Sequence, residues 1–218
     1  RGAGIGHHIQ IWNLETLELL HTVLLPPAEG LEIDYNPFEA RLLADRKTVM
    51  IETLSCGLYV LGDIGGEAPK AEYVHHFAEE PHCSLPVRLN NYWVQSVENE
   101  GGGFNGIIVL DISDPVNPIE VNRLTIGDGF SPHWLSPNRS GEKIVITGYG
   151  KELSRRVMIL DFDSDTGTIS VDPYFGSGDD AGAGFIIDRE MWPHGATGKA
   201  IAHGSVYWPP APPDWQAN

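Results

Sequence analysis

The sequence has few basic residues and no long hydrophobic run. Lysine and arginine together number 14 against 30 acidic residues, which gives a net charge of −16. Nucleic-acid binding depends on clustered lysine and arginine, so this balance argues against a nucleic-acid partner and against an anionic membrane surface. No apolar run approaches the roughly 18 residues that a membrane span needs. We therefore expect a soluble protein, of either the cytoplasm or the periplasm.

Cysteine is also scarce, with Cys56 and Cys83 as the two examples. Two cysteines do not make a disulfide framework, and free cysteine is among the most buried residue types. We therefore expect two buried thiols in preference to a bridge between them. The chain begins Arg-Gly-Ala-Gly and its first strand signal follows at Ile9–Leu14. This start is typical of a processed or truncated product, in which a targeting segment can already have been removed.

Helical periodicity is nearly absent, and short β-rich runs separated by turn clusters take its place. Four segments share one form, an apolar strand, an Asn or Asp, a turn and a second strand. Their polar residues are Asn13, Asp63, Asp111 and Asp161, at steps of 50, 48 and 50 residues. A period near fifty with about four strands per repeat is typical of a β-propeller, in which each repeat forms one blade. The polar residue is expected to close its turn by hydrogen bonding to the backbone that follows.

The predicted fold is therefore all-β, a single propeller domain or propeller fragment over residues 1–218 with four-stranded blades. The blades are predicted at residues 1–30 (partial), 31–80, 81–130 and 131–175, with residues 176–218 as a tail or closing segment. The first blade lacks its inner strands, so a fragment of a larger ring is favoured over a closed four-bladed ring. A β-sandwich has similar strand spacing but does not account for the fifty-residue repeat.

Two histidines occupy equivalent positions in neighbouring repeats. His82 and His133 lie 51 residues apart, and each follows a proline. The innermost strands of a propeller begin at one mouth of its channel, so equivalent residues form a ring there, and imidazoles in such a ring suit zinc, copper or iron. If both histidines point to the axis, Cys83 and Trp134 point away, into the packing between blades. Cys83 is then not a metal ligand.

Two further histidines, His194 and His203, are each followed by glycine, which permits close approach of the backbone. Together with the repeat-related pair they form the predicted metal site, and no catalytic residue is assigned. Each of the four alone is more simply a loop residue that caps a strand end. The equivalent position in the second repeat falls near Glu39, so that blade would contribute a carboxylate or nothing.

Several stretches resemble the selenium-binding protein family, which includes the copper-dependent methanethiol oxidases. They include HHIQIWNLETLELLHTVLL, VLDISDPVNPIEVNRLTIG, PHWLSPNRSGEKIVITG and AHGSVYWP, and the resemblance spans most of the chain. It implies part of a seven-bladed propeller, a metal, most simply copper, held by His82, His133, His194 and His203, and oxidation of a small thiol with release of sulfide and peroxide. Iron or zinc would suit the same ligands. The family's N-terminal cysteine motif is absent, so selenium binding is not expected.

Three functions stay open at this point. The first is a copper-dependent oxidoreductase that acts on a small thiol, with metal at the four histidines. The second is a non-catalytic propeller that binds a ligand or protein, with the histidines as ordinary loop residues. The third is a metal-dependent lactonase or hydrolase on the same fold, which needs carboxylates such as Glu39 or Asp128 in the ring. Convergence of the imidazole nitrogens would separate the first function from the second.

Overall fold

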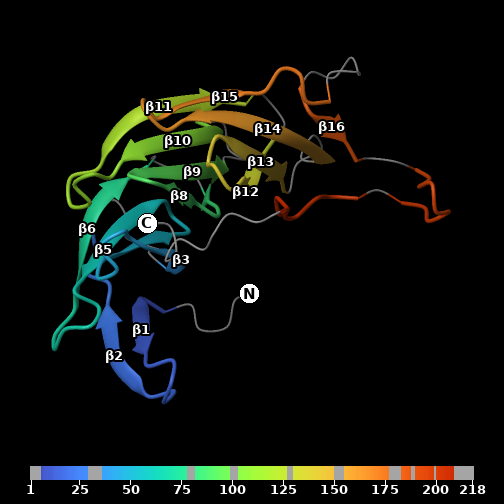
Figure 1. The fold of residues 1–218 in the computed structure, drawn as a ribbon. Helices are drawn as coiled ribbons and strands as arrows, with labels where there is room; N and C mark the ends of the chain where they lie inside the picture. The colour runs from blue at the N-terminus through green and yellow to red at the C-terminus, as the bar shows by residue number, and fades with distance from the viewer. Residues whose placement is uncertain are drawn as a thin grey trace.

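The computed structural model of the chain describes residues 6–28, 36–77, 82–98, 103–126, 130–149, 155–176, 183–187, 190–198 and 200–208. Regular structure in these ranges is almost entirely strand, and none of it is a helix long and apolar enough to span a bilayer. The strands (Figure 1) are β1 (His8–Trp12), β2 (Leu19–Leu24), β3 (Pro37–Leu42), β4 (Val49–Thr53), β5 (Gly57–Gly62), β6 (Lys70–His76), β7 (His82–Cys83), β8 (Val87–Leu89), β9 (Tyr92–Glu98), β10 (Gly106–Asp111), β11 (Ile119–Thr125), β12 (Pro132–Pro137), β13 (Lys143–Gly148), β14 (Arg156–Asp163), β15 (Thr168–Val171) and β16 (Phe185–Ile186).

The strands form four antiparallel sheets that follow one another along the chain and fan out in an arc (Figure 1). The first sheet holds β1 and β2 alone, and the second has the order β3-β4-β5-β6. In the third sheet β7 and β8 both pair with β9, which is followed by β10 and β11. The fourth has the order β12-β13-β14-β15, with β16 added beside β14. The predicted all-β fold with four-stranded repeats is confirmed.

The turns between the outer strands show why the repeat carries a polar residue. Oδ1 of Asn13 accepts hydrogen bonds from the backbone N–H of Glu15 (2.9 Å) and Thr16 (3.1 Å). Oδ1 of Asp111 accepts one from Ser113 (2.8 Å), and hydrogen bonding to Ser113 lowers the pKa of Asp111. These contacts confirm the predicted role of the polar residue in the first and third repeats.

The prediction for Asp161 is wrong. Its carboxylate forms an ion pair with Lys143 of the neighbouring strand, and Asp163 closes the turn by accepting a hydrogen bond from the N–H of Asp165 (2.8 Å). In this repeat β14 extends to Asp163, which moves the start of the turn two residues along the chain.

The hydrophobic core lies between consecutive sheets. In β10, Ile107 and Val109 pack toward the fourth sheet, whereas Ile108 and Leu110 pack toward the second. Successive side chains of a strand point to opposite faces, so a strand that is buried on both faces must be continuously apolar. This requirement explains runs such as IIVL, in which each residue is fully buried.

A disulfide joins the second and third sheets, which corrects the expectation of two free thiols. Cys56, in the turn between β4 and β5, is bonded to Cys83 of β7, with Cα atoms 4.9 Å apart. The backbone N–H of Cys83 also donates to the carbonyl of Leu54 at 3.1 Å, which holds β7 against that turn. The expectation failed because the pairing depends on contact between two sheets, which residue burial preferences do not show.

Candidate functional site

His133 lies on β12 at a break in the regular strand pairing. The register of β12 against β13 shifts between Pro132 and Trp134, so His133 is the extra residue of a bulge. A bulge re-aims the side chain it carries, and here the imidazole is turned toward the third sheet. An equivalent shift in β3 lies between Pro37 and Glu39 and places Phe38 at the matching position of the second sheet. The carboxylate expected near Glu39 therefore has no counterpart at this position.

A carboxylate of the third sheet meets the His133 ring. Nδ1 of His133 lies 2.6 Å from Oε1 of Glu98, the last residue of β9, and the two side chains are only 13% and 15% exposed. A carboxylate oxygen accepts, so the His133 ring donates its Nδ1–H to Glu98, and Nε2 is the ring nitrogen that takes no part in this contact. The hydroxyl of Ser131 in turn donates to Oε2 of Glu98 at 3.4 Å.

Two serines complete the surroundings of His133: Ser84, in the connection between β7 and β8, and Ser96 of β9. Oγ of buried Ser84 also lies 2.6 Å from Nδ1 of His133, and Oγ of Ser96 donates to the His133 carbonyl at 3.1 Å. Ser84 and Glu98 share one ring nitrogen. In a serine–histidine–acid triad the base uses its two nitrogens for the two partners, so this arrangement is not such a triad.

The His133 ring also meets two more rings. The ring centroid of His203 lies 4.7 Å from that of His133, and the centroid of Tyr149 lies 5.0 Å from His133 and 5.1 Å from His203. His203 belongs to the segment 200–208, which has no strand pairing. The structure thus brings together two histidines that are 70 residues apart in the sequence.

His82 lies beside this cluster on β7. It is the register partner of Glu98 in the antiparallel pair β7–β9, and side chains of such partners share one face of a sheet. His82 is exposed, whereas Cys83 is buried and bonded to Cys56. The two side chains therefore point in opposite directions, as the strand period predicts.

His194 lies elsewhere. It is exposed on a small hairpin closed by a bridge between Met191 and Thr197, and its ring stacks on Trp192 with centroids 6.4 Å apart. No contact described in the structure joins His194 to the other three histidines. Across the described ranges, no group of three or more His, Cys, Asp or Glu side chains has the geometry to hold a metal ion as it stands.

Of the two carboxylates named for the hydrolase alternative, Glu39 forms an ion pair with Arg41, and Asp128 lies outside the described residues. Glu98 is the functional candidate that the sequence analysis missed. It lies 35 residues before His133 and in a different sheet, so neither repeat spacing nor strand alternation links the two.

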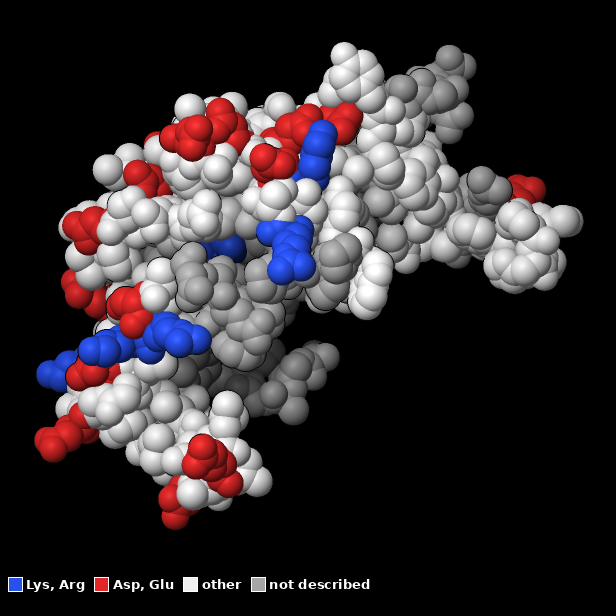
Figure 2. All heavy atoms as spheres, in the orientation of Figure 1, with Lys and Arg blue, Asp and Glu red and all other residues white. Residues whose placement is uncertain are grey.

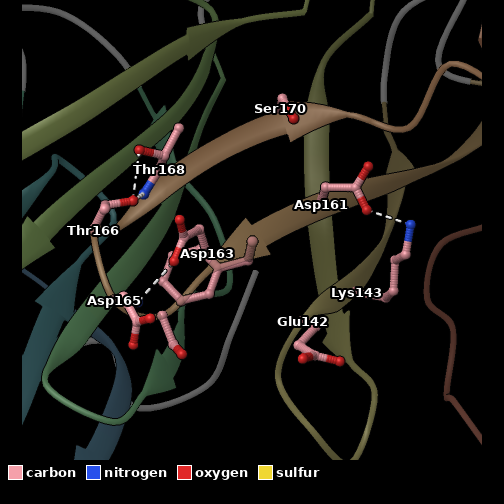
Figure 3. Close-up of a pocket in the computed structure, with 10 residues that line it drawn as sticks. Glu142, Lys143, Asp161, Asp163, Asp165, Thr166, Thr168 and Ser170 are labelled. Atoms are coloured by element: carbon pink, nitrogen blue, oxygen red, sulfur yellow. Dashed lines mark hydrogen bonds and ion pairs between the residues drawn. The ribbon is translucent and has the colours of Figure 1, made fainter.

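A hollow of about 730 Å³ lies at the outer edge of the fourth sheet and is lined by acidic and hydroxyl side chains (Figure 3). Lys143 forms an ion pair with Asp161, and Asp163 accepts a hydrogen bond from the backbone N–H of Asp165 in the turn that follows. The histidine cluster lies at the opposite end of β13, next to Tyr149. Acidic side chains are spread over the face of the molecule shown in Figure 2, so the hollow is one part of a general negative surface.

The successive antiparallel sheets, packed face to face in an arc, define a β-propeller fold. No protein-family model and no curated protein matches the chain. Among solved structures, a hypothetical selenium-binding protein from Sulfolobus tokodaii has a TM-score of 0.61 at 15% identity, over 78% of this chain and 46% of that protein. The likeness lies in the fold.

Two putative 6-phosphogluconolactonases show the same fold. The one from Bacteroides fragilis has a TM-score of 0.55 at 11% identity, over 73% of this chain and 44% of that protein. The one from Bacteroides uniformis has a TM-score of 0.56 at 12% identity, over 76% of this chain and 47% of that protein. The chain thus spans a little under half the length of each of these three structures.

Proposed function

We propose that this chain is part of a copper-dependent propeller oxidoreductase that acts on a small thiol at the His133 cluster. The observation that supports this most directly is the contact between Nδ1 of His133 and Glu98. Histidines that bind metals commonly donate their other ring N–H to a carboxylate, which fixes the tautomer and the ring orientation and raises the basicity of the metal-binding nitrogen. Glu98 does this for His133 and leaves Nε2 as the ligand atom.

The proposed ligands are Nε2 of His133 and the imidazoles of His203 and His82. The His133 and His203 rings are already in contact, and His82 lies on the same face of the third sheet as Glu98. Imidazole ligands suit copper, and also zinc or iron. His194, the fourth histidine predicted from the sequence, is not included among these ligands, because its hairpin projects away from the cluster (Figure 1).

When bound, copper would supply one-electron chemistry toward a thiol and dioxygen. If sulfur leaves as sulfide and dioxygen leaves as peroxide, electron balance requires the thiol carbon to be oxidised to a carbonyl, with water as the source of its oxygen. The protein's own contribution is to hold His133 through Glu98 and Ser84 and to leave the site accessible. His82, His203 and Tyr149 are all exposed, so a small substrate can reach the cluster.

Metal analysis tests the proposal. We expect purified protein, reconstituted with Cu²⁺ and desalted, to hold one copper per chain by elemental analysis, and His133→Ala and His203→Ala to lose it. His21→Ala is the matched control, because His21 lies on β2 in the first sheet, away from the cluster. Absence of stoichiometric copper, zinc or iron after reconstitution would overturn the proposal and favour a non-catalytic binding module.

A second candidate is a metal-dependent lactonase, which the carboxylate of Glu98 favours, because hard divalent cations prefer oxygen ligands. The two putative lactonases named above share only the fold. Thiol-dependent dioxygen uptake by the copper-loaded protein would support the oxidase. Lactone hydrolysis with Mn²⁺ or Ca²⁺, lost in Glu98→Gln, would support the lactonase instead.

A further inference from the structure

His203 reaches the cluster on a segment that belongs to no sheet. Residues 202–207, which we name the arm, lie over the face of the fourth sheet that points away from the third. Thr147 of that face donates its hydroxyl to the carbonyl of His203 at 3.4 Å. At the far end of the arm, burial raises the pKa of Tyr207. The charge of Lys143 lowers this pKa and the charge of Asp172 raises it. The arm therefore meets β13 at Thr147, near the end of that strand.

Two consecutive residues of the arm contact two consecutive residues of β12. His203 meets His133 ring to ring at 4.7 Å, and Gly204 lies against the indole of Trp134. A Cβ atom added at Gly204 would lie 3.1, 3.2 and 3.4 Å from three atoms of that indole. The Gly204 backbone is not in the left-handed region, so it is this close approach, and not its dihedral angles, that favours glycine here.

We propose that the arm is a separate docking element that delivers His203 to His133, and that Gly204 is its positioning residue. The close contact between Gly204 and Trp134 determines how near the arm lies to the sheet. Because His203 directly precedes Gly204, this contact also determines how near His203 lies to His133. A side chain at position 204 lifts the arm and moves His203 away from His133. This inference deepens the proposed metal function and rests on it for its purpose, although the docking can be tested without metal.

The first test follows the arm in metal-free protein by hydrogen–deuterium exchange of peptides that cover residues 200–208. We expect Gly204→Val to raise exchange there and Gly204→Ala to raise it less. Gly65→Val is the matched control, because a Cβ at Gly65 meets nothing within 4 Å. Because Trp134→Leu removes the indole, the effect of Gly204→Val should be smaller in that background, which is the signature of residues in contact. Unchanged exchange in Gly204→Val, with the fold intact by circular dichroism, would overturn the proposal.

The second test measures Cu²⁺ affinity by titration. Loss of a group that orients a ligand typically weakens metal binding about 10–100-fold, and we expect that loss for Gly204→Val. Adding Gly204→Val to His203→Ala should cause no further loss, because the arm acts through His203. A full additional loss would contradict the positioning role. If wild type binds no copper but the exchange results hold, the proposed function fails and the docking arm stands.

Discussion

Nδ1 of His133 and Oε1 of Glu98 lie 2.6 Å apart across the junction between the third and fourth sheets. The contact belongs to neither sheet alone and exists because β9 and β12 pack beside each other. It also fixes the proton of His133 on Nδ1, because the carboxylate has no hydrogen to give. The chemistry of the cluster therefore depends on how two blades meet.

Replacing this carboxylate tests its importance directly. Glu98→Gln keeps the size of the side chain and removes its charge, so it should weaken Cu²⁺ binding about 10–100-fold while the melting temperature changes little. Glu67→Gln, an exposed glutamate in the turn after β5, serves as the control for the loss of one negative charge. Isothermal titration measures the Cu²⁺ affinity of both variants. Equal affinities of Glu98→Gln and Glu67→Gln would show that Glu98 does not contribute to metal binding.

The bridge between Cys56 and Cys83 should account for a measurable part of the stability. It spans 27 residues, and its replacement by alanine at both positions should lower the free energy of unfolding by about 2–4 kcal/mol. Urea denaturation measures this change. Thiol labelling of the unfolded, unreduced wild type should detect no free cysteine, and two labelled thiols would contradict the bridge.

Glu52 should make the stability of the protein depend on pH. It is 0% exposed, and neither carboxylate oxygen has a hydrogen-bond partner among the described residues. Burial raises the pKa of Glu52 well above its usual value, Glu39 adds to the shift and Arg41 opposes it. The side chains of β9 that face the second sheet, which include Trp93 and Val97, carry no charge. Burial therefore favours the neutral form of Glu52 in the folded protein.

The sign of the effect follows from proton binding. Between the unfolded glutamate pKa of about 4.3 and the higher folded value, the folded state binds more protons than the unfolded state. The contribution of Glu52 is therefore full below about pH 4.3 and declines as pH rises toward the folded pKa. Glu52→Gln should remove this decline. In urea denaturation from pH 5 to 8, the free energy of unfolding of the variant should therefore rise relative to that of wild type as pH increases. Parallel pH profiles would refute the assignment.

Gly167 should tolerate no side chain. Its φ is +71°, and an added Cβ would lie 2.6 Å from the Tyr92 ring and 2.9 Å from Val121 of the third sheet. The left-handed backbone alone costs a residue with a side chain about 1–2 kcal/mol. We expect Gly167→Ala to lose at least that much by thermal denaturation, and Gly65→Ala to lose less. A neutral Gly167→Ala would show that the turn between β14 and β15 does not pack against Tyr92 and Val121.

The sequence predicts the repeat because its signals are local. Asn13 and Asp111 close their turns through residues two or three positions along the chain, and the apolar run before Asp111 requires a strand buried on both faces. Asp161 shows the limit of this reasoning, because an ion pair with Lys143 and a longer strand displace the turn. The ion-pair partner lies on the neighbouring strand β13, and the extra length belongs to β14 itself, so neither follows from the spacing of the repeat.

The candidate site is harder to predict because its members come from different sheets. The repeat draws attention to His133, and the glycine beside His203 draws attention to the tail. Contact between the two depends on the docked arm, and nothing in the spacing of Glu98 points to His133. His194 has the same flanking glycine as His203 but lies on an exposed hairpin. A flanking glycine therefore does not distinguish the two.

The covalent link between Cys56 and Cys83 has a consequence for the cluster, because His82 and Ser84 are the residues on either side of Cys83. One of them faces Glu98 and the other touches His133. Thiol–disulfide exchange at this bond would free the short strand between them. The order of the histidine cluster thus depends in part on a covalent bond between two sheets that takes no part in its chemistry.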